Sequence, residues 1–243
     1  MSIQSVDRAL EALEVLAAVG EAGVGKIAER LDVHKSTASR LLASLAAHGL
    51  VEQDGAGGAY RLGFGLVRLA GSVTSRLDLS QAAQSLCDRV AAALDLTANV
   101  AVLDDVFAVN VSQAVGPGLM APRHYVGLRT PGHATSSGKA LLAHDEAAAR
   151  RAAADLQAHT PATITDEEAL REELDRVRAQ GWAASNEEWE QHITAVAVPL
   201  RLPGGDVEAA LTVTGPTRSL PPEAFAETAD RLCRMTASSG RWA

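Results

Sequence analysis

The sequence predicts an α+β fold in two parts, a small helical part with a hairpin and a larger part built on a mainly antiparallel sheet. Three observations predict it. Apolar residues recur at three- and four-residue steps in several segments, apolar runs typical of strands occur in others, and glycine-containing turns separate them. With 243 residues and 47% apolar side chains, the chain can bury the core of one domain or two. We expect a first domain over residues 1–63, a linker helix over 64–78 and a second domain over 79–243.

The first 49 residues show helical periodicity in three segments. One face of the first segment collects Val6, Ala9, Leu10, Leu13, Leu16 and Ala17. A glycine-containing break separates this segment from a short second helix over residues 26–31. The third segment, residues 35–49, turns Ala38, Leu41, Leu42 and Leu45 toward the core and closes with Gly49, which suits the left-handed position after a helix. The second and third helices, joined by a tight turn, predict a helix-turn-helix.

A small hairpin follows the third helix. Two short strands, residues 50–53 and 59–62, flank a glycine-rich turn, so the first domain is a winged helix-turn-helix. Such a helix fits the major groove of DNA, where hydroxyl and guanidinium groups contact bases or phosphates. The candidate DNA-binding residues are Lys35, Ser36, Thr37, Ser39, Arg40 and Ser44 on the third helix, Arg61 on the hairpin and Arg8 on the first helix.

Each of these interpretations has a simpler alternative. Residues 1–62 could form an ordinary three-helix packing module with a solvated polar face. The Arg40 side chain could pair with Glu29 or Asp32 instead of contacting DNA, and Arg8 is either a clamp on the DNA backbone or a solvated charge.

The net charge of −8 is distributed unevenly and does not exclude nucleic acid. Residues 1–76 carry eight Lys or Arg and eight Asp or Glu, so all the excess acid lies beyond them. The stretch 33–51 contains Lys35 and Arg40 and no acidic residue. A locally cationic surface is therefore compatible with an acidic protein.

Composition also excludes several classes of protein. No apolar run reaches the length of a membrane span, and the N-terminus carries Asp7, Arg8 and Glu11 where a signal peptide is apolar. Cys87 and Cys233 are far apart within helical apolar patterns, which predicts two reduced, buried thiols. We expect a cytoplasmic protein without a disulfide or a cysteine zinc site.

The larger part alternates irregularly between helical and strand-like segments. Residues 63–94 are mostly helical in pattern and suggest a helix bridging the two domains. Strands are expected over 97–103, 107–112, 120–128, 193–202 and 207–215, and helices over 137–143, 146–156, 166–181 and from Pro222 to near Ala237. The last two strands flank a Pro-Gly-Gly-Asp turn, which predicts an antiparallel hairpin.

The loop PGHATSSGK, residues 131–139, leads into a helix, so we compare it with known phosphate-binding and nucleophile motifs. The phosphate-loop pattern fails, because its first glycine would be His133 and its last hydroxyl residue would be Ala140. Ser136 and Lys139 are three residues apart, so a Ser-Lys nucleophile is an alternative, but no partner that would orient a base is visible. The histidines lack ligand spacing, so we expect no metal, no cofactor and no catalytic residue.

Three stretches of the chain resemble the IclR family of transcriptional regulators. The first combines SVDRALEALEVLA with KIAERLDVHKSTASRLLASLAAHGLVEQD and YRLG, the second is VGLRTPGHATSSGKALLA, and the third combines GWAASNEEWEQHITAVAVPL with AALTVTGP. The resemblance implies a winged helix-turn-helix, a linker helix and a GAF-like domain whose antiparallel sheet has flanking helices. It also implies dimers or tetramers.

The resemblance further implies a pocket for a small organic effector in the GAF-like domain. By motif position the effector-binding candidates are Leu119, Met120, Thr130, Ser136, Ser137, Ser185, Asn186, Thr212 and Thr214. Thr212 and Thr214 are two apart, so on a strand they face the same side, where they either present hydroxyls or simply fill the core. Tyr125 and Trp189 either pack against a ligand ring or belong to the core.

Two positions depart from the family pattern. Many members have an acidic residue where Ser185 stands and a cysteine where Ala195 stands, so two polar anchors are missing. Neighbouring polar residues are possible substitutes, although the pair Glu187 and Glu188 is more typical of a solvated turn. The nature of the ligand is therefore open at this stage.

The function that the sequence favours is a ligand-responsive transcriptional regulator, by family habit a repressor of a catabolic or metabolic operon. Its partners are expected to be an imperfectly palindromic operator, a small effector such as a carboxylic or aromatic acid, and further copies of the chain, with no membrane involved. The alternatives are a small-molecule enzyme or sensor with a tethering N-terminal module, and a purely structural interaction protein.

Overall fold

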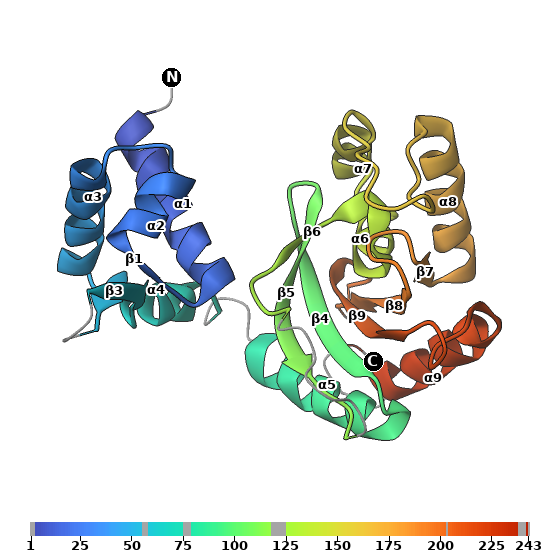
Figure 1. Ribbon diagram of the computed structural model, residues 1–243. Coiled ribbons are helices and arrows are strands. Elements are labelled where there is room, and N and C mark those ends of the chain that lie inside the picture. Colours follow the sequence, from blue (N-terminus) through green and yellow to red (C-terminus); the bar gives the residue numbers. More distant parts are fainter. Residues whose placement is uncertain are drawn as a thin grey trace. The chain divides into compact units, whose positions relative to one another are not determined.

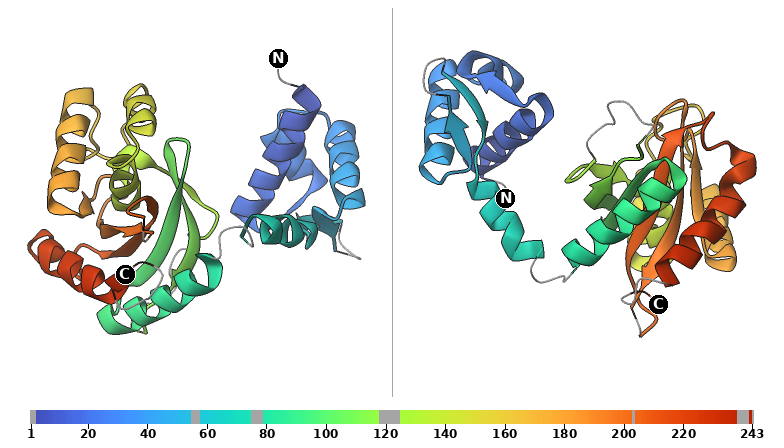
Figure 2. Two further views of the ribbon diagram at one scale, coloured as in Figure 1. Left: turned by 180° about the vertical axis from the view of Figure 1, so that it is seen from behind. Right: turned by 90° about the horizontal axis from the view of Figure 1, so that it is seen from below.

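The computed structural model describes residues 3–54, 58–74, 79–117, 125–202, 204–237 and 242. The chain forms two compact units, the first ending at Asp78 and the second beginning at Leu79 (Figures 1 and 2). No helix in these described ranges is long and apolar enough to cross a membrane.

The first unit packs three helices against a small sheet. The helices are α1 (Gln4–Val19), α2 (Val24–Arg30) and α3 (Lys35–Ala47), and the strands are β1 (Glu21–Gly23), β2 (Val51–Gln53) and β3 (Ala59–Leu62). The sheet is antiparallel with strand order β1-β3-β2. The break predicted between the first two helices was therefore wrong in part, because it contains a strand. Strand β1 forms because it pairs with β3, and the buried Ala22 of β1 lies opposite Tyr60 of β3.

The core-facing side of α1 differs from the predicted one. Ala12 and Leu16 are fully buried, and Ala9 and Leu13 pack against the same core. In contrast, Val6 and Leu10 are 50% and 55% exposed, and Ala17 is also exposed. At 100° per residue these three residues lie together to one side of the buried stripe. The apolar stripe of α1 is thus wider than the surface that the core covers.

Helix α3 follows its predicted pattern closely. Ala38, Leu42 and Leu45 are buried, and Leu41 is half-buried. The helix begins at Lys35, and Gly49 two residues beyond its end has a φ of +70°, as the sequence predicts. The period of its apolar residues therefore fixes which side of α3 faces the solvent.

The predicted helical stretch after the hairpin contains two helices. Helix α4 (Gly65–Thr74) occupies most of the predicted linker, and α5 (Leu79–Leu94) opens the second unit. The linker positions 75–78 lie outside the described residues.

The second unit is built on a six-stranded antiparallel sheet of order β6-β5-β4-β9-β8-β7. Its strands are β4 (Thr97–Asp104), β5 (Phe107–Ala114), β6 (Arg129–Pro131), β7 (Ala183–Asn186), β8 (Ile193–Arg201) and β9 (Val207–Pro216). Helices α5 and α9 (Phe225–Ala237) cover one face. Helix α6 (Ser136–Leu142) covers the other face, with α7 (Glu146–Ala153) and α8 (Glu167–Gln180) beside it (Figure 1).

Three predictions for the second unit were wrong in detail. Strand β7 was missed. Of the strand expected over 120–128 the structure describes residues 125–128, which form only an isolated bridge between Val126 and Asn110, and β6 begins just beyond them. Residues 118–124 lie outside the described part of the chain. Cys87 is buried, which raises the pKa of its thiol to about 12, whereas Cys233 is exposed because it lies beside the buried stripe of α9. Both cysteines are free thiols.

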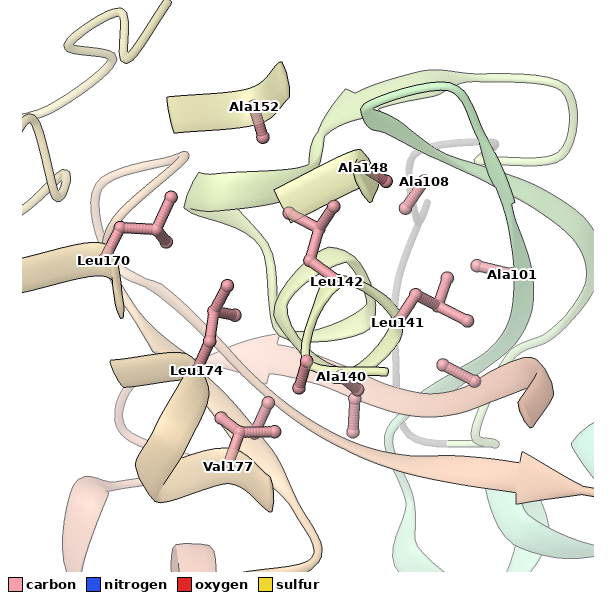
Figure 3. Packing of buried hydrophobic residues seen from close by; sticks show 14 residues of the cluster. Ala101, Ala108, Ala140, Leu141, Leu142, Ala148, Ala152, Leu170, Leu174 and Val177 are labelled. Carbon is pink, nitrogen blue, oxygen red and sulfur yellow. The ribbon is translucent and has the colours of Figure 1, made fainter. Parts of the chain in front are cut away.

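Helix α6 lies at the centre of the core and every one of its residues is buried. Its Ala140, Leu141 and Leu142 pack between the sheet and α8, where Leu174 and Val177 meet them (Figure 3). At its start, a side chain on Gly138 would overlap the backbone of Gly132, so only glycine permits this approach. The first turn of α6, with Ser136 and Ser137, is thereby held in a fixed place against the sheet.

Candidate functional site

The outer side of α3 presents most of the predicted DNA-binding residues to solvent. Lys35, Ser36, Ser39, Arg40 and Ser44 are exposed, and Thr37 is half-buried. The opposite side of the helix is anchored in the core of the first unit. The surface therefore combines a rigid backbone with short hydroxyl side chains and two cations, which allows close approach to a polyanion.

The start of α3 is organised by a histidine cap. The Nδ1 atom of His34 accepts from the backbone N–H of Ser36 at 3.3 Å and lies 2.8 Å from the Ser36 hydroxyl. The cap satisfies a backbone donor that the helix itself leaves unpaired. Ser36 is thus both a candidate DNA contact and part of the helix cap.

The predicted cations differ in their surroundings. Arg61 on β3 pairs with Glu52 on β2 at 3.5 Å, and both side chains are exposed. Arg8 on α1 is half-buried. Among the described residues Arg40 makes no ion pair, so the alternative pairing with Glu29 or Asp32 does not occur there. Arg40 is therefore available to a ligand without first breaking an internal pair.

A small cavity in the second unit lies between the start of α6 and the sheet. It has a volume of about 50 Å³. Six of the nine predicted effector-binding residues line it, namely Thr130, Ser136, Ser137, Ser185, Thr212 and Thr214. Asn186 is exposed and is not among the lining residues, and Leu119 and Met120 lie outside the described residues.

Antiparallel pairing brings distant parts of the chain together at this cavity. On the floor, Asn99 of β4 is directly opposite Thr212 of β9. Farther along the sheet, Thr214 pairs with Ala195 of β8, which in turn pairs with Ser185 of β7. The cavity is thus a property of the assembled sheet and the α6 loop, not of one segment.

Several hydroxyls in the cavity wall already have partners in the chain. The Ser185 hydroxyl donates to the carbonyl oxygen of Ala134 at 3.0 Å, and the Thr130 hydroxyl donates to that of Ala108 at 3.1 Å. Thr135 donates to Pro131 and accepts from the backbone N–H of Gly138, which caps α6. These hydrogen bonds hold the wall of the cavity in place. In contrast, Asn99 Oδ1 and Thr212 Oγ1 are buried without a hydrogen-bond partner in the described chain.

Sequence reasoning missed several lining residues. Asn99, Asn110, Thr135, Glu190 and Ile193 line the cavity but were not candidates. The signal for the two asparagines was present, because an amide within an apolar strand is unusual unless it has a partner. The aromatic candidates Tyr125 and Trp189 do contribute to the wall, as does Ala195.

A buried ion cluster is centred on Lys139 of α6. Lys139 is 1% exposed, and its Nζ lies 2.8 Å from both carboxylate oxygens of Glu188 and 3.0 Å from Glu173 Oε1 on α8. Burial raises the pKa of Glu188, and the Lys139 ammonium opposes that shift. The expectation that Glu188 belongs to a solvated turn was therefore wrong, because Lys139 holds it inside.

The same cluster bears on the proposed Ser-Lys nucleophile. An ammonium that donates to two carboxylates has no lone pair with which to take a proton from Ser136. Among the residues that the structure describes, no group of three or more His, Cys, Asp or Glu could hold a metal ion. In this arrangement Lys139 is therefore not placed to act as the base for Ser136.

Comparisons with known proteins agree with both units. Residues 5–55 match the IclR helix-turn-helix domain, and residues 71–239 match the domain described as bacterial transcriptional regulator IclR C-terminal. The HTH-type transcriptional regulator BhcR of Paracoccus denitrificans is 34% identical over 218 residues, covering 88% of this chain and 78% of that protein.

Solved structures give the same result for the fold. An IclR transcriptional regulator from Alicyclobacillus acidocaldarius has a TM-score of 0.81 at 30% identity, over 100% of this chain and 99% of that one. An IclR homolog from Microbacterium hydrocarbonoxydans, complexed with 4-hydroxybenzoate, has a TM-score of 0.79 at 29% identity, over 97% of both chains. The helix-turn-helix, the α+β second unit and these matches along the whole chain lead to one conclusion: this protein belongs to the IclR family of bacterial transcriptional regulators and is a regulator, not an enzyme.

Proposed function

We propose that the protein is a repressor of a catabolic or metabolic operon, whose operator binding changes when a small organic effector occupies the second unit. The observation that carries the proposal is the presence in one chain of an exposed cationic α3 surface and a polar cavity. Operator binding in the cytoplasm is part of the proposal.

Contacts with DNA are assigned to α3 and the wing. Lys35 and Arg40 supply positive charge to phosphates or guanine, and the exposed serines donate or accept at base edges. Arg61 on the wing adds a phosphate contact, and Arg8 on α1 is a second backbone contact. These are the residues whose substitution should change affinity without changing the fold.

Self-association is supported by the uncovered side of α1. Ile3, Val6 and Leu10 are 68%, 50% and 55% exposed; Val6 and Leu10 share one flank of α1, and Ile3 directly precedes the helix. Contiguous apolar surface of this kind is typical of contacts between proteins. We propose a dimer, or a tetramer built from dimers, in which two α3 helices read half-sites about 34 Å apart on an imperfect palindrome.

Effector binding is assigned to the cavity around Ser136, Ser137 and Thr214, with Leu119 and Met120 as further candidates. A carboxylic or aromatic acid is the starting class for the search, since the homolog from Microbacterium hydrocarbonoxydans is complexed with 4-hydroxybenzoate. Such a ligand acts by population shift, because it favours whichever geometry of the assembled protein binds it better.

The test uses the full-length protein and duplexes tiled upstream of its own gene and of the adjacent genes. Fluorescence anisotropy should find one duplex bound at least about 10³-fold tighter than its shuffled control, with log affinity falling linearly as log salt rises. A thermal-shift screen then selects acids that raise the melting temperature, and each is added to the operator assay. Equal binding to every duplex and its shuffled control would overturn the proposal.

A further inference from the structure

The floor of the cavity carries two buried polar atoms without a hydrogen-bond partner in the part of the chain that the structure describes. Asn99 and Thr212 are 3% and 5% exposed, and neither Asn99 Oδ1 nor Thr212 Oγ1 has a hydrogen-bond partner in the described chain. They are the only buried side-chain N or O atoms without one among the described residues. Both residues line the cavity. A buried unpaired polar group costs free energy, so a site that keeps two of them side by side is built to pair them with something else.

Strand pairing places these two groups within reach of a single ligand atom. Asn99 and Thr212 are direct partners across the β4–β9 ladder. The Cβ atoms of such partners lie about 4.5–5.5 Å apart, so one oxygen above them can contact both side chains. The two groups also differ in kind, since the amide oxygen accepts only, whereas the threonine hydroxyl donates and accepts.

From this pair we infer that the effector carries a hydroxyl group, which lies on the β4–β9 floor, donates to Asn99 Oδ1 and accepts from the Thr212 hydroxyl. The inference rests on the proposed function and specifies the chemical class of its ligand. A carboxylate oxygen at the same place would face Asn99 Oδ1 with two acceptors and no proton between them. A hydroxyl satisfies both groups at once.

The charge of the wall agrees with this assignment. None of the described lining residues is Lys, Arg or His, and Glu190 is the one carboxylate among them. The floor therefore offers hydrogen bonds without a cation that would pair with an acid group. Any acid group of the effector is directed elsewhere, and the hydroxyl is the part that the floor recognises.

Matched ligand pairs test the inference directly. Isothermal titration of the full-length protein compares lactate with propionate, 3-hydroxybutyrate with butyrate, and 3- and 4-hydroxybenzoate with benzoate. We expect at least one hydroxyl-bearing member to bind, and each that binds to do so at least about tenfold tighter than its partner, because sites built around a hydroxyl reject analogues that lack it. Asn99→Leu and Thr212→Val should abolish the preference.

Thermal stability of the ligand-free protein gives a readout that does not depend on choosing the right ligand. Thr212→Val and Asn99→Leu remove unpaired groups and should leave the melting temperature unchanged or raise it. Thr194→Val is the matched control, because Thr194 is also buried on this sheet but its hydroxyl donates to the Leu220 carbonyl oxygen at 2.6 Å. That variant should melt at a lower temperature.

The outcomes separate this inference from the proposed function. Hydroxyl-free members that bind as tightly as their partners, a panel in which no hydroxyl-bearing member binds, or a Thr212→Val variant as destabilised as Thr194→Val would each overturn the inference. The proposed function fails instead if the same wild-type preparations do not distinguish any operator duplex from its shuffled control.

Discussion

The α3 surface and the cavity wall both present short hydroxyl side chains, but water surrounds the first and protein surrounds the second. On α3, Ser39 and Ser44 are exposed, so their polar groups are satisfied by solvent whether or not DNA is bound. In the cavity, the Ser185 and Thr130 hydroxyls donate to backbone carbonyl oxygens, whereas the Thr212 hydroxyl has no partner among the described residues. The comparison teaches that a substitution among the exposed hydroxyls of α3 should leave the stability of the fold unchanged, whereas a substitution in the cavity wall changes the hydrogen bonds that hold the wall.

The largest expected effect is that of Lys139→Met, which tests the buried side of this comparison. Removing the ammonium leaves the buried Glu188 carboxylate without its counter-charge, whereas Glu173 keeps its pair with Arg176. Breaking a buried pair in this way costs about 3–5 kcal/mol of unfolding free energy. All three tryptophans lie in the second unit, so tryptophan fluorescence during urea unfolding reports this unit alone.

The control for that variant is an exposed ion pair on the same helix as Glu173. Arg171 pairs with Glu168 at 3.2 Å, and both side chains are more than 60% exposed. Arg171→Met should change the unfolding free energy by less than about 0.5 kcal/mol. If Lys139→Met behaves like Arg171→Met, the buried cluster does not hold the cavity region together.

Arg40→Ala is the corresponding test on the α3 surface. If Arg40 makes a bidentate contact with a base, the variant loses about 1–3 kcal/mol of operator binding free energy, measured by anisotropy. Circular dichroism should show the same melting curve as the wild type, because the side chain is exposed and has no ion pair among the described residues. Unchanged affinity would remove Arg40 from the interface, and Arg171→Ala serves as the charge-matched control.

The same contrast explains which elements the sequence could predict. The period of Ala38, Leu42 and Leu45 is a local property, and it predicted both the helix and its outer surface. Strands β1 and β7 have only three and four residues and no period of their own, so they were missed. They are strands because β3 and β8 lie beside them.

The candidate site divides in the same way. Ser136, Ser137, Thr212 and Thr214 were predicted from motifs that resemble a family. Asn99 was not, because its place opposite Thr212 joins positions that are far apart in the sequence. The ion pair of Lys139 with Glu188 likewise depends on the packing of α6 against a distant loop. Local patterns carry no information about such partners.

Acid should destabilise the second unit, because two of its histidines are held neutral. Burial lowers the pKa of His133 and, with help from Arg201 and Arg178, the pKa of His144. At these two histidines the unfolded chain therefore binds more protons than the folded chain below pH 6.5. The contribution of these histidines to the unfolding free energy is fully present above pH 6.5. It is lost as the pH falls from 6.5 toward their lowered pKa values in the folded chain.

Urea unfolding followed by tryptophan fluorescence between pH 7.5 and pH 5 measures this loss. His144→Gln keeps an acceptor for Arg201, whose Nη2 lies 3.1 Å from His144 Nε2, and should reduce the slope. His48→Gln changes an exposed residue of the first unit and should leave the slope of stability against pH unchanged. A slope that His144→Gln does not alter would assign the pH dependence to other groups.

The smallest expected effect is on the wing, where Arg61 has a partner already. Its pair with Glu52 is exposed, so Arg61→Ala should change stability by less than about 1 kcal/mol. If Arg61 contacts a phosphate, the variant lowers the slope of log affinity against log salt by about 0.9 and weakens binding equally for all sequences. Glu52→Gln provides the reverse change, because it releases Arg61 and removes a negative charge near the DNA, so operator binding should tighten. An Arg61→Ala variant with the wild-type salt slope would place the wing away from the phosphates and leave α3 and Arg8 as the proposed DNA contacts of the first unit.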